Sequence, residues 1–537
     1  MPIPPDPSEG RPDSGPNGPK GPVHKQAQAM GQKVGGGMAW LTIATAVVKA
    51  ASLVNMAILG ILLAKEDFGI FGTAIGVAAL INVLRDGGVR RILIQKGRHR
   101  YPGLVGPIYA WTLLLNILAA AILCALGPAM AAYHKNDQYV MVMVTLGLAA
   151  LIYGPSMIYQ ARLSMEYRYK AVATMNASSA IVRYIAMISL ALAGAGPLTF
   201  TWSLVIIAAY EWLFGLCVTR DPLIRFKPRF RLWPAIWARA KWLLLGALAL
   251  ALLRQGDYLV LGMILEPRIM GIYVFAYMIG DQVMALLASN LQQVLMPTMA
   301  AFQHDRERHV KAILRAAGAL VMVAAIFAGG IAVTIRPLEQ LLWDGKWASA
   351  VPAVQALSLC FALRLLVSLQ ESALSSTGRF RTQFHALLVQ GLGMATVAGL
   401  GGLFFPDNPG AIAMAIGLWF VVGVTGMAAW SLGRIGVRQA DFLRAVLKPW
   451  ALLTGIALLV IAADLWLIDT LTARALEPDA QDATHPMGLV LRAAISAMAY
   501  GLLALLAIRV ALPNTLRDLL AIAPGKVTRL AGPLLRM

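Results

Sequence analysis

The sequence is poor in charge, in acidic residues and in cysteine. Charged residues make up 13% of the 537, about half the usual share of a soluble domain, and 26 acidic residues stand against 46 Lys and Arg. A chain with so little charge and so much apolar surface is neither disordered nor an ordinary soluble enzyme. The three cysteines lack metal-ligand spacing and provide no disulfide framework.

Motifs of cofactor binding and catalysis are also missing. There is no G-x-x-x-x-G-K-[ST] phosphate loop, so direct use of ATP is unsupported. Six of the seven histidines lie in tails or predicted loops, and His385 opens a predicted span without a Ser/Asp pair in a readable motif. The sequence therefore predicts no cofactor, no metal site and no enzyme of these classes.

Long apolar runs are what the sequence has in abundance. Hydrophobic residues make up 59% of the chain, and runs of about 20 residues, each long enough to cross a bilayer as a helix, recur along it. We predict an all-α integral membrane protein with about fourteen spans. The predicted spans lie near residues 38–64, 69–89, 104–129, 138–160, 172–193, 198–218, 242–264, 270–295, 312–335, 351–373, 384–405, 410–432, 450–468 and 487–509.

Lys and Arg alternate between the predicted loops. One set of alternate loops, together with both tails, carries 33 of them, and the other set carries 6. By the positive-inside rule the first set faces the cytoplasm. The net charge of +20 then lies against anionic lipid headgroups rather than nucleic acid. We expect a multi-pass protein of the inner (cytoplasmic) membrane with both termini in the cytoplasm.

An internal repeat divides the chain. LGILLAKEDFGIF (59–71) and LGMILEPRIMGIY (261–273) match without gaps at Leu, Gly and Ile positions and end in an aromatic residue. They lie six spans apart, which indicates two six-helix lobes related by an axis along the membrane normal. A chance match of two hydrophobic turns is the alternative. The predicted parts are a disordered tail (1–37), a first lobe (38–218), a basic linker (219–241), a second lobe (242–432), two added spans (433–510) and a basic tail (511–537).

Ionisable residues near the middle of a span are candidates for function, because a charge at the bilayer centre is expensive. We expect the mid-span cations to bind an anionic substrate group, and the acids to couple an ion or to form ion pairs. Pairing within one helix is the alternative, for Arg254 with Asp257 and for Arg364 with Glu371. The cations are Lys49, Arg183, Arg254 and Arg364, and the acids are Glu211, Asp257 and Asp281.

Several of these residues lie on polar faces of predicted helices. Lys49, Ser52 and Asn55 continue a stripe along the first span. Such a face is costly against lipid, so we expect it to line a wet cavity or the interior of the bundle. The other stripe residues are Thr42 and Thr45 in span 1, Asn176, Ser179 and Arg183 in span 5, and Asp281, Ser289 and Gln292 in span 8.

The segment 62–95 resembles the second-helix region of the Wzx-type polysaccharide flippases. That region has a leucine-rich end, a P-E-D-F-G-like turn, a D-x-G motif and a hydrophobic L-I-Q. Here Lys65 stands in place of the usual Pro, whereas Asp86, Gly88 and Gln95 fit the pattern.

Three further segments resemble the same family. Residues 257–277 match its D-x-x-x-I-G…L-G-x-Y-x-x-A segment with Met270 where Leu is common, and VLMPTMAAFQHD (294–305) and LLWDGKWASAVPAVQALSL (341–359) follow in order. The resemblance implies the multidrug/oligosaccharidyl-lipid/polysaccharide (MOP) flippase superfamily. It implies two six-helix bundles around a central cavity and the outward transfer of a lipid-linked oligosaccharide, with membrane lipids, a polysaccharide polymerase and export proteins as partners.

Three other functions stay open. A membrane polymerase or glycosyltransferase of the same pathway needs a sizeable outer loop, and the longest predicted ones, 336–350 and 469–486, are short. A cation-coupled drug antiporter and a peptidoglycan-precursor flippase belong to the same superfamily. The substrate that is transported distinguishes these two functions from the transfer of a lipid-linked oligosaccharide.

Overall fold

The chain folds entirely into helices in the part that the structure describes. The computed structural model describes residues 48–86, 89–166, 168–220, 233–282, 284, 305–474, 486–513 and 515–516, and no strand occurs among them. Twelve helices there are long and apolar enough to cross a membrane. An all-α membrane protein is thereby confirmed.

Twelve of the fourteen predicted spans correspond to these helices. The other two are described only in part: the first as an apolar helix over Val48–Leu62, and the eighth as helix over 267–282. The predicted tail 1–37, residues 221–232 of the linker 219–241, and residues 514 and 517–537 of the tail 511–537 lie outside the described residues. The predicted boundaries of the lobes therefore stay predictions.

The helices have the following bounds. In chain order they are α2 (Lys65–Asp86), α3 (Val89–His134), α4 (Gln138–Met165), α5 (Tyr169–Leu192), α6 (Leu198–Thr219), α7 (Trp233–Ile264), α9 (Arg306–Trp343), α10 (Val351–Phe361), α11 (Leu365–Ser376), α12 (Phe380–Phe404), α13 (Pro409–Trp419), α14 (Thr425–Gly433), α15 (Gln439–Arg474) and α16 (Pro486–Ala511).

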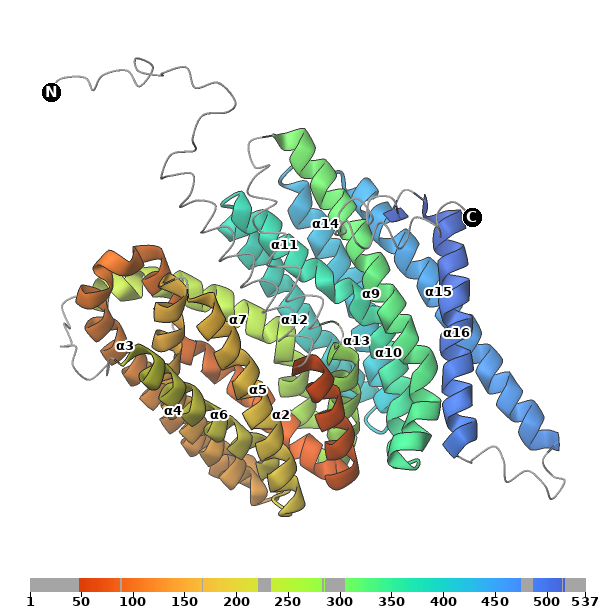
Figure 1. Ribbon diagram of the computed structural model, residues 1–537, viewed down its shortest axis with the longest axis horizontal. Coiled ribbons are helices and arrows are strands. Elements are labelled where there is room, and N and C mark those ends of the chain that lie inside the picture. Colours follow the sequence, from red (N-terminus) through yellow and green to blue (C-terminus); the bar gives the residue numbers. More distant parts are fainter. Residues whose placement is uncertain are drawn as a thin grey trace, which may run out of the picture.

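The helices gather into two groups that meet along α2 and α7 (Figure 1). By chain order we call helix 48–62 and α2–α6 the first bundle; within it α4 packs against α3 and α6, and α5 packs against α6. In the second bundle, α7, helix 267–282 and α9–α14, α7 packs against α12, and α10 packs against α9 and α13. Helices α15 and α16 pack against α9, at the edge of the second bundle.

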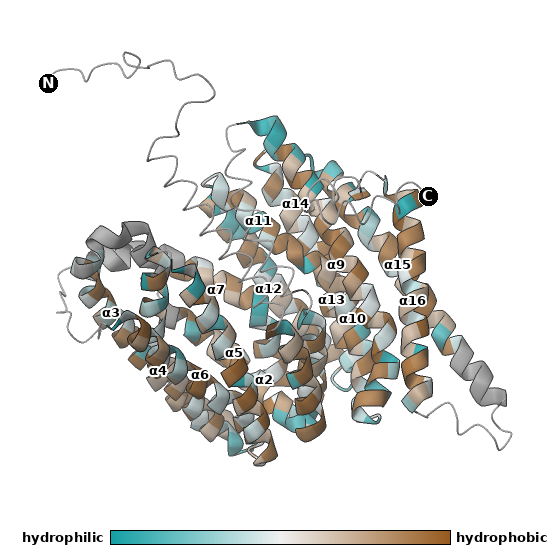
Figure 2. Ribbon diagram, in the orientation of Figure 1, coloured by the Kyte–Doolittle hydropathy of each residue, from teal (hydrophilic) through white to brown (hydrophobic). Residues whose placement is uncertain are grey.

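The outward surfaces of the helices are apolar. Brown, hydrophobic residues run along most helices in Figure 2 and hydrophilic residues gather toward their ends, as lipid requires. Leu192, Val422 and Val510 are each about 70% exposed, which suits acyl chains and not water. The same side chains in a soluble protein would form an aggregation-prone surface.

The turn between α9 and α10 is shorter than predicted. The sequence predicts a loop over 336–350, but α9 continues through Pro337 to Trp343, and both residues are buried. Packing of this last stretch extends the helix, which ends with Asp344 in the left-handed region. Only residues 344–347 then separate α9 from a short 3-10 turn. One of the two longest predicted outer loops is thus reduced to a tight turn.

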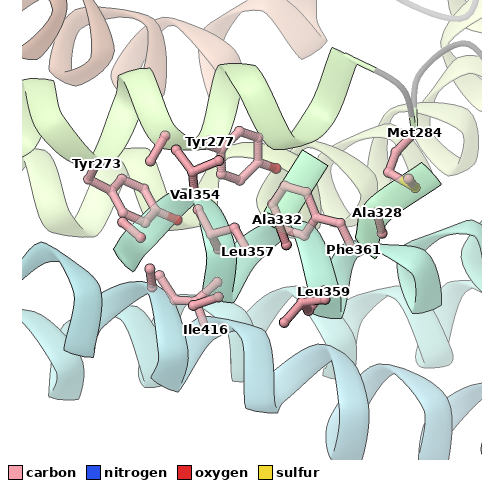
Figure 3. Packing of buried hydrophobic residues seen from close by; sticks show 14 of the residues in the cluster. Tyr273, Tyr277, Met284, Ala328, Ala332, Val354, Leu357, Leu359, Phe361 and Ile416 are labelled. Atoms are coloured by element: carbon pink, nitrogen blue, oxygen red, sulfur yellow. The ribbon is translucent and has the colours of Figure 1, made fainter. Parts of the chain in front are cut away.

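The core of the second bundle lies between helix 267–282 and α10. Figure 3 shows Tyr273 and Tyr277 reaching from that helix toward Val354, Leu357 and Phe361 of α10. The Tyr277 and Phe361 rings meet edge to face, with centroids 4.9 Å apart. This packing fixes the helix that carries Asp281 and the end of α10, directly before Arg364.

Candidate functional site

Two helices of the second bundle are broken near their middles. A 3-10 turn, Ala362–Arg364, separates α10 from α11, and a π-turn, Phe420–Val424, separates α13 from α14. The two breaks contact each other. In membrane transporters, broken helices near mid-depth provide backbone groups and side chains for binding sites, and π-turns are frequent at functional sites.

Arg364 lies at the first break and pairs with Asp281. Its Nη1 lies 2.5 Å from Asp281 Oδ1, and its guanidinium lies 5.3 Å from the Tyr277 ring and 5.4 Å from the Phe361 ring. The arginine is therefore held by one carboxylate and two aromatic faces. Lys49, on helix 48–62 of the first bundle, also interacts electrostatically with Asp281. Asp281 thus pairs with Arg364, and its charge also acts on Lys49 without an ion pair between them.

Asp257 and Arg254 lie on α7 beside the same tyrosines. Asp257 is fully buried, and Tyr273 donates its hydroxyl proton to Asp257 Oδ2 at 2.6 Å. Tyr277 donates to the backbone carbonyl of Arg254 at 3.3 Å, and the Arg254 side chain is exposed. Among the described residues no ion pair joins Arg254 to Asp257, because the buried carboxylate turns toward Tyr273. The pairing within α7 that the spacing allowed is not formed.

The polar stripe of helix 48–62 faces protein and not lipid. Ser52 is 9% exposed and donates to Gln282 Oε1 at 2.9 Å, which links the two bundles beside Asp281. Asn55 is 6% exposed, and its Nδ2 lies 3.8 Å from Met187 Sδ on α5. The other predicted stripe residues of spans 1 and 8, Thr42, Thr45, Ser289 and Gln292, lie outside the described residues.

Arg183 and Glu211 lie apart from this cluster, in the first bundle. Arg183 is one helical turn from Met187 on α5, and its Nε is buried without a hydrogen-bond partner among the described residues. Glu211 is 7% exposed on α6, the helix that packs against α5. The structure thus brings together five of the seven predicted residues, Lys49, Arg254, Asp257, Asp281 and Arg364.

Sequence reasoning overlooked the tyrosines that organise the cluster. Tyr273, Tyr277 and Asp281 recur every four residues, so they share one face of helix 267–282. That spacing was visible in the sequence, but aromatic residues in a span are usually read as packing. Here their hydroxyl groups contact the carboxylate of Asp257 and the backbone of Arg254.

The arrangement suits an anion better than a metal ion. The cluster holds three cations, Lys49, Arg254 and Arg364, against two carboxylates, Asp257 and Asp281. Within the described residues, no group of three His, Cys, Asp or Glu side chains is placed to hold a metal. Of the three cations, Lys49 and Arg364 are partly buried and Arg254 is exposed; all three can make charge-assisted contacts to phosphate or carboxylate groups.

These features define a polytopic transporter-like membrane protein with a partly cationic site between two helix bundles. A solved structure titled "Lipid II flippase MurJ, inward closed conformation" superposes with a TM-score of 0.64, at 12% identity, over 87% of this chain and 98% of that one. An inward-facing multidrug resistance MATE family transporter of the MOP superfamily superposes with a TM-score of 0.57, at 14% identity, over 73% and 98%. The fold is that of the MOP superfamily.

The chain belongs to the polysaccharide biosynthesis protein family, whose profile matches residues 58–352, more than half of its length. It is 21% identical over 430 residues to the lipopolysaccharide biosynthesis protein WzxC of Escherichia coli, covering 78% of this chain and 84% of that protein. It is 20% identical over 438 residues to the teichuronic acid biosynthesis protein TuaB of Bacillus subtilis, covering 80% and 88%. The resemblance to the Wzx-type flippases is confirmed.

Proposed function

We propose that this protein moves a polyprenyl-(di)phosphate-linked oligosaccharide from the cytoplasmic to the outer leaflet by alternating access, for exopolysaccharide or lipopolysaccharide assembly. The observation that carries the proposal is the cluster of Lys49, Arg364 and Asp281 between the bundles. Membership of the polysaccharide biosynthesis protein family supports the glycan part of the substrate. The MOP fold supports transport rather than catalysis.

The physical task is to shelter a polar headgroup. A sugar hydroxyl that enters hydrocarbon without a partner costs roughly 2–7 kcal/mol, and an oligosaccharide carries many hydroxyls. A hydrated passage between the bundles removes most of that cost, and the polyprenyl tail stays in the bilayer. The phosphates are charges that every such substrate carries, and they need opposite charges at mid-depth. Lys49 and Arg364 supply them from the two sides of the passage.

Asp281 makes binding moderate rather than tight. Its Oδ1 lies 2.5 Å from Arg364 Nη1, so an incoming phosphate must displace the carboxylate before it can bind the guanidinium. The cost of separating this pair is subtracted from the affinity for the phosphate. When the passage opens outward, Asp281 pairs with Arg364 again and so helps to release the substrate. Asp257 and Asp281 are also the candidates for coupling a proton or a sodium ion.

Orientation follows from the charge of the turns. We infer that the turns near 63–64, 135–137, 265–266 and 344–347, which belong to the loops with few cations, face outward. The turns on the basic side and both termini then face the cytoplasm, and the membrane is the cell's inner membrane. In this proposal the two bundles are six-helix lobes, a polysaccharide polymerase and export proteins act downstream, and nucleic acid is not a partner.

The test is a transfer assay in vesicles. Purified protein is reconstituted with a fluorescent polyprenyl-diphosphate oligosaccharide, and the fraction that a membrane-impermeant reagent reaches is followed with time. We expect transfer by the wild type, slower transfer by Lys49→Met, and unchanged transfer by Lys135→Met, a control at an exposed turn. In cells, deletion of the gene should stop polymer export while lipid-linked repeat units accumulate inside.

The same assay decides among the other functions. Transfer of a peptidoglycan precursor in preference to a lipid-linked repeat unit would favour the precursor flippase, and efflux of a cationic drug would favour the antiporter. Longer glycans formed in the vesicles would show a polymerase. Equal transfer of a lipid that lacks phosphate would contradict the role of the cations.

A further inference from the structure

A lysine from the second bundle closes the end of a helix in the first. The ammonium of Lys346, in the turn after α9, donates to three backbone carbonyls at the end of helix 48–62. The distances are 3.0, 2.9 and 2.7 Å, to Gly60, Ile61 and Leu63. The last carbonyls of a helix have no partner within it, and a cation there complements the helix dipole. Here that cation comes from about 285 residues away in the chain.

Two tryptophans of the second bundle reach the same helix end. The indole N–H of Trp347 donates to Gly60 O at 2.9 Å, and that of Trp343 donates to Ala57 O at 3.0 Å. Trp347 is fixed within its own bundle, because its ring stacks on Phe275 with centroids 3.7 Å apart. Lys346, Trp343 and Trp347 therefore present five hydrogen bonds from a rigid base to the other bundle.

Next to these contacts the two bundles cross with almost no side chain between them. A Cβ on Gly69 would collide with the carbonyl of Pro267, and a Cβ on Gly271 would collide with the carbonyl of Lys65. Gly69 and Gly271 hold equivalent places in the repeat, as do Lys65 and Pro267, so the contact is reciprocal. Backbones that touch in this way separate only when the bundles themselves move apart.

Among the residues that the structure describes, the equivalent helix end in the second copy has a much weaker cap. The carbonyl of Met263, which corresponds to Ile61, accepts one hydrogen bond at 2.8 Å from the hydroxyl of Tyr133 at the end of α3. That tyrosine is 59% exposed, so water competes for the bond. The two helix ends thus differ: a single neutral hydroxyl group caps the one in the second copy, whereas one ammonium and two indoles cap the one in the first copy.

We propose that Lys346, Trp343 and Trp347 form an outer latch that holds the outer ends of the two bundles together and must release before cargo can leave outward. The role of this latch in cargo release rests on the proposed function. Burial lowers the pKa of Lys346, and the nearby Asp67 carboxylate opposes that shift. The side chain is only half-buried, so its ammonium rehydrates when the latch opens. The latch can therefore open without leaving a buried charge unpaired.

The test compares Lys346→Met with a matched control, Lys135→Met. Lys135 lies in the corresponding turn of the first copy, between α3 and α4, and is exposed. Spin labels at residues 132 and 407, in a cysteine-free background, report the distance between the outer ends of the bundles. We expect Lys346→Met to raise the population of the long distance relative to the short one by about ten-fold, the effect of one charge-assisted hydrogen bond. The control should match the unsubstituted protein.

Unchanged distances in Lys346→Met would overturn the latch. A second arm does not depend on weakening the fold: cysteines at 61 and 346 are joined by a short, cleavable thiol cross-linker. Cross-linked protein should keep the short distance and stop cargo transfer, and cleavage should restore both the long distance and transfer. Transfer at an unchanged rate in the cross-linked protein would also refute the latch. The distance measurements use no cargo, so a wrong substrate assignment would fail only in the transfer assay.

Discussion

The two copies of the repeat use different chemistry at the same place. The matching segments begin at residues 59 and 261, so Asn55 corresponds to Asp257 and Phe71 to Tyr273. In the second copy Tyr273 donates to Asp257 at 2.6 Å. In the first copy Phe71 has no hydroxyl group, and the Oδ1 of Asn55 is buried without a partner among the described residues. The second copy thus supplies a hydroxyl donor to its buried side chain at this position, and the first copy does not.

This difference between the two bundles predicts how substitutions in each affect stability and transport. In the second bundle Arg364 and Asp281 satisfy each other, so removing one partner leaves a poorly solvated charge. In the first bundle Arg183 has a buried Nε with no acceptor in the described part of the chain, so a substrate can use it without breaking a bond. We therefore expect substitution of Arg364 to reduce stability as well as transport, and substitution of Arg183 to reduce transport alone.

The largest effect should follow from breaking the ion pair of the second bundle. Arg364→Ala removes the ion-pair partner of Asp281 and leaves only the charge of Lys49 beyond ion-pair distance, so we expect a loss of about 3 kcal/mol in the free energy of unfolding in mixed micelles. The value lies at the low end for buried pairs because the Asp281 side chain is 35% exposed. Adding Asp281→Ala should recover most of the loss. A double variant as unstable as the sum of the two single variants would show that the pair is not coupled.

Installing the chemistry of the second copy in the first tests the repeat directly. Asn55→Asp places a buried carboxylate without a donor and should cost about 2 kcal/mol of unfolding free energy. Adding Phe71→Tyr supplies the missing hydroxyl group and should recover about 1 kcal/mol. Phe71→Tyr alone is the control. If the second substitution recovers nothing, the two positions are not structurally equivalent to Asp257 and Tyr273.

Removing the hydroxyl group in the second copy should have a smaller effect. Tyr273→Phe keeps the ring but leaves Asp257, which is fully buried, without its donor. We expect a loss of about 1.5 kcal/mol in unfolding free energy, measured in the same micelles. In an Asp257→Leu background the same substitution should cost much less. An equal loss in both backgrounds would mean that Tyr273 acts through packing alone.

The smallest change in stability should come from the arginine of the first bundle. Arg183→Gln keeps much of the apolar stem and removes a charge that has no hydrogen bond at Nε, so the unfolding free energy should change by less than about 0.5 kcal/mol. Transfer of the lipid-linked oligosaccharide should nevertheless fall several-fold. Wild-type transfer in this variant would remove Arg183 from the proposed substrate path.

The sequence predicts the architecture better than the site. Mid-span cations and acids were visible because ionisable residues are rare in apolar runs. Their partners were not: Arg364 and Asp281 lie 83 residues apart, and their pairing depends on how helix 267–282 crosses the break after α10. Spacing along α7 allowed Arg254 to pair with Asp257, but a neighbouring helix supplies Tyr273 instead. The sequence does not single out Lys346, because a lone lysine in a turn gives no local signal of a long-range contact.

The sequence by itself determined that this chain is a bundle of membrane-spanning helices with a repeat and a strong bias of basic residues. Lipid offers no hydrogen bonds to the backbone, so each long apolar run must satisfy its own as a helix. Only the tertiary structure decided which charges meet, which helix end Lys346 caps, and where two glycines let the bundles touch. Those contacts join residues far apart in the chain, and the packing of whole helices against one another fixes them.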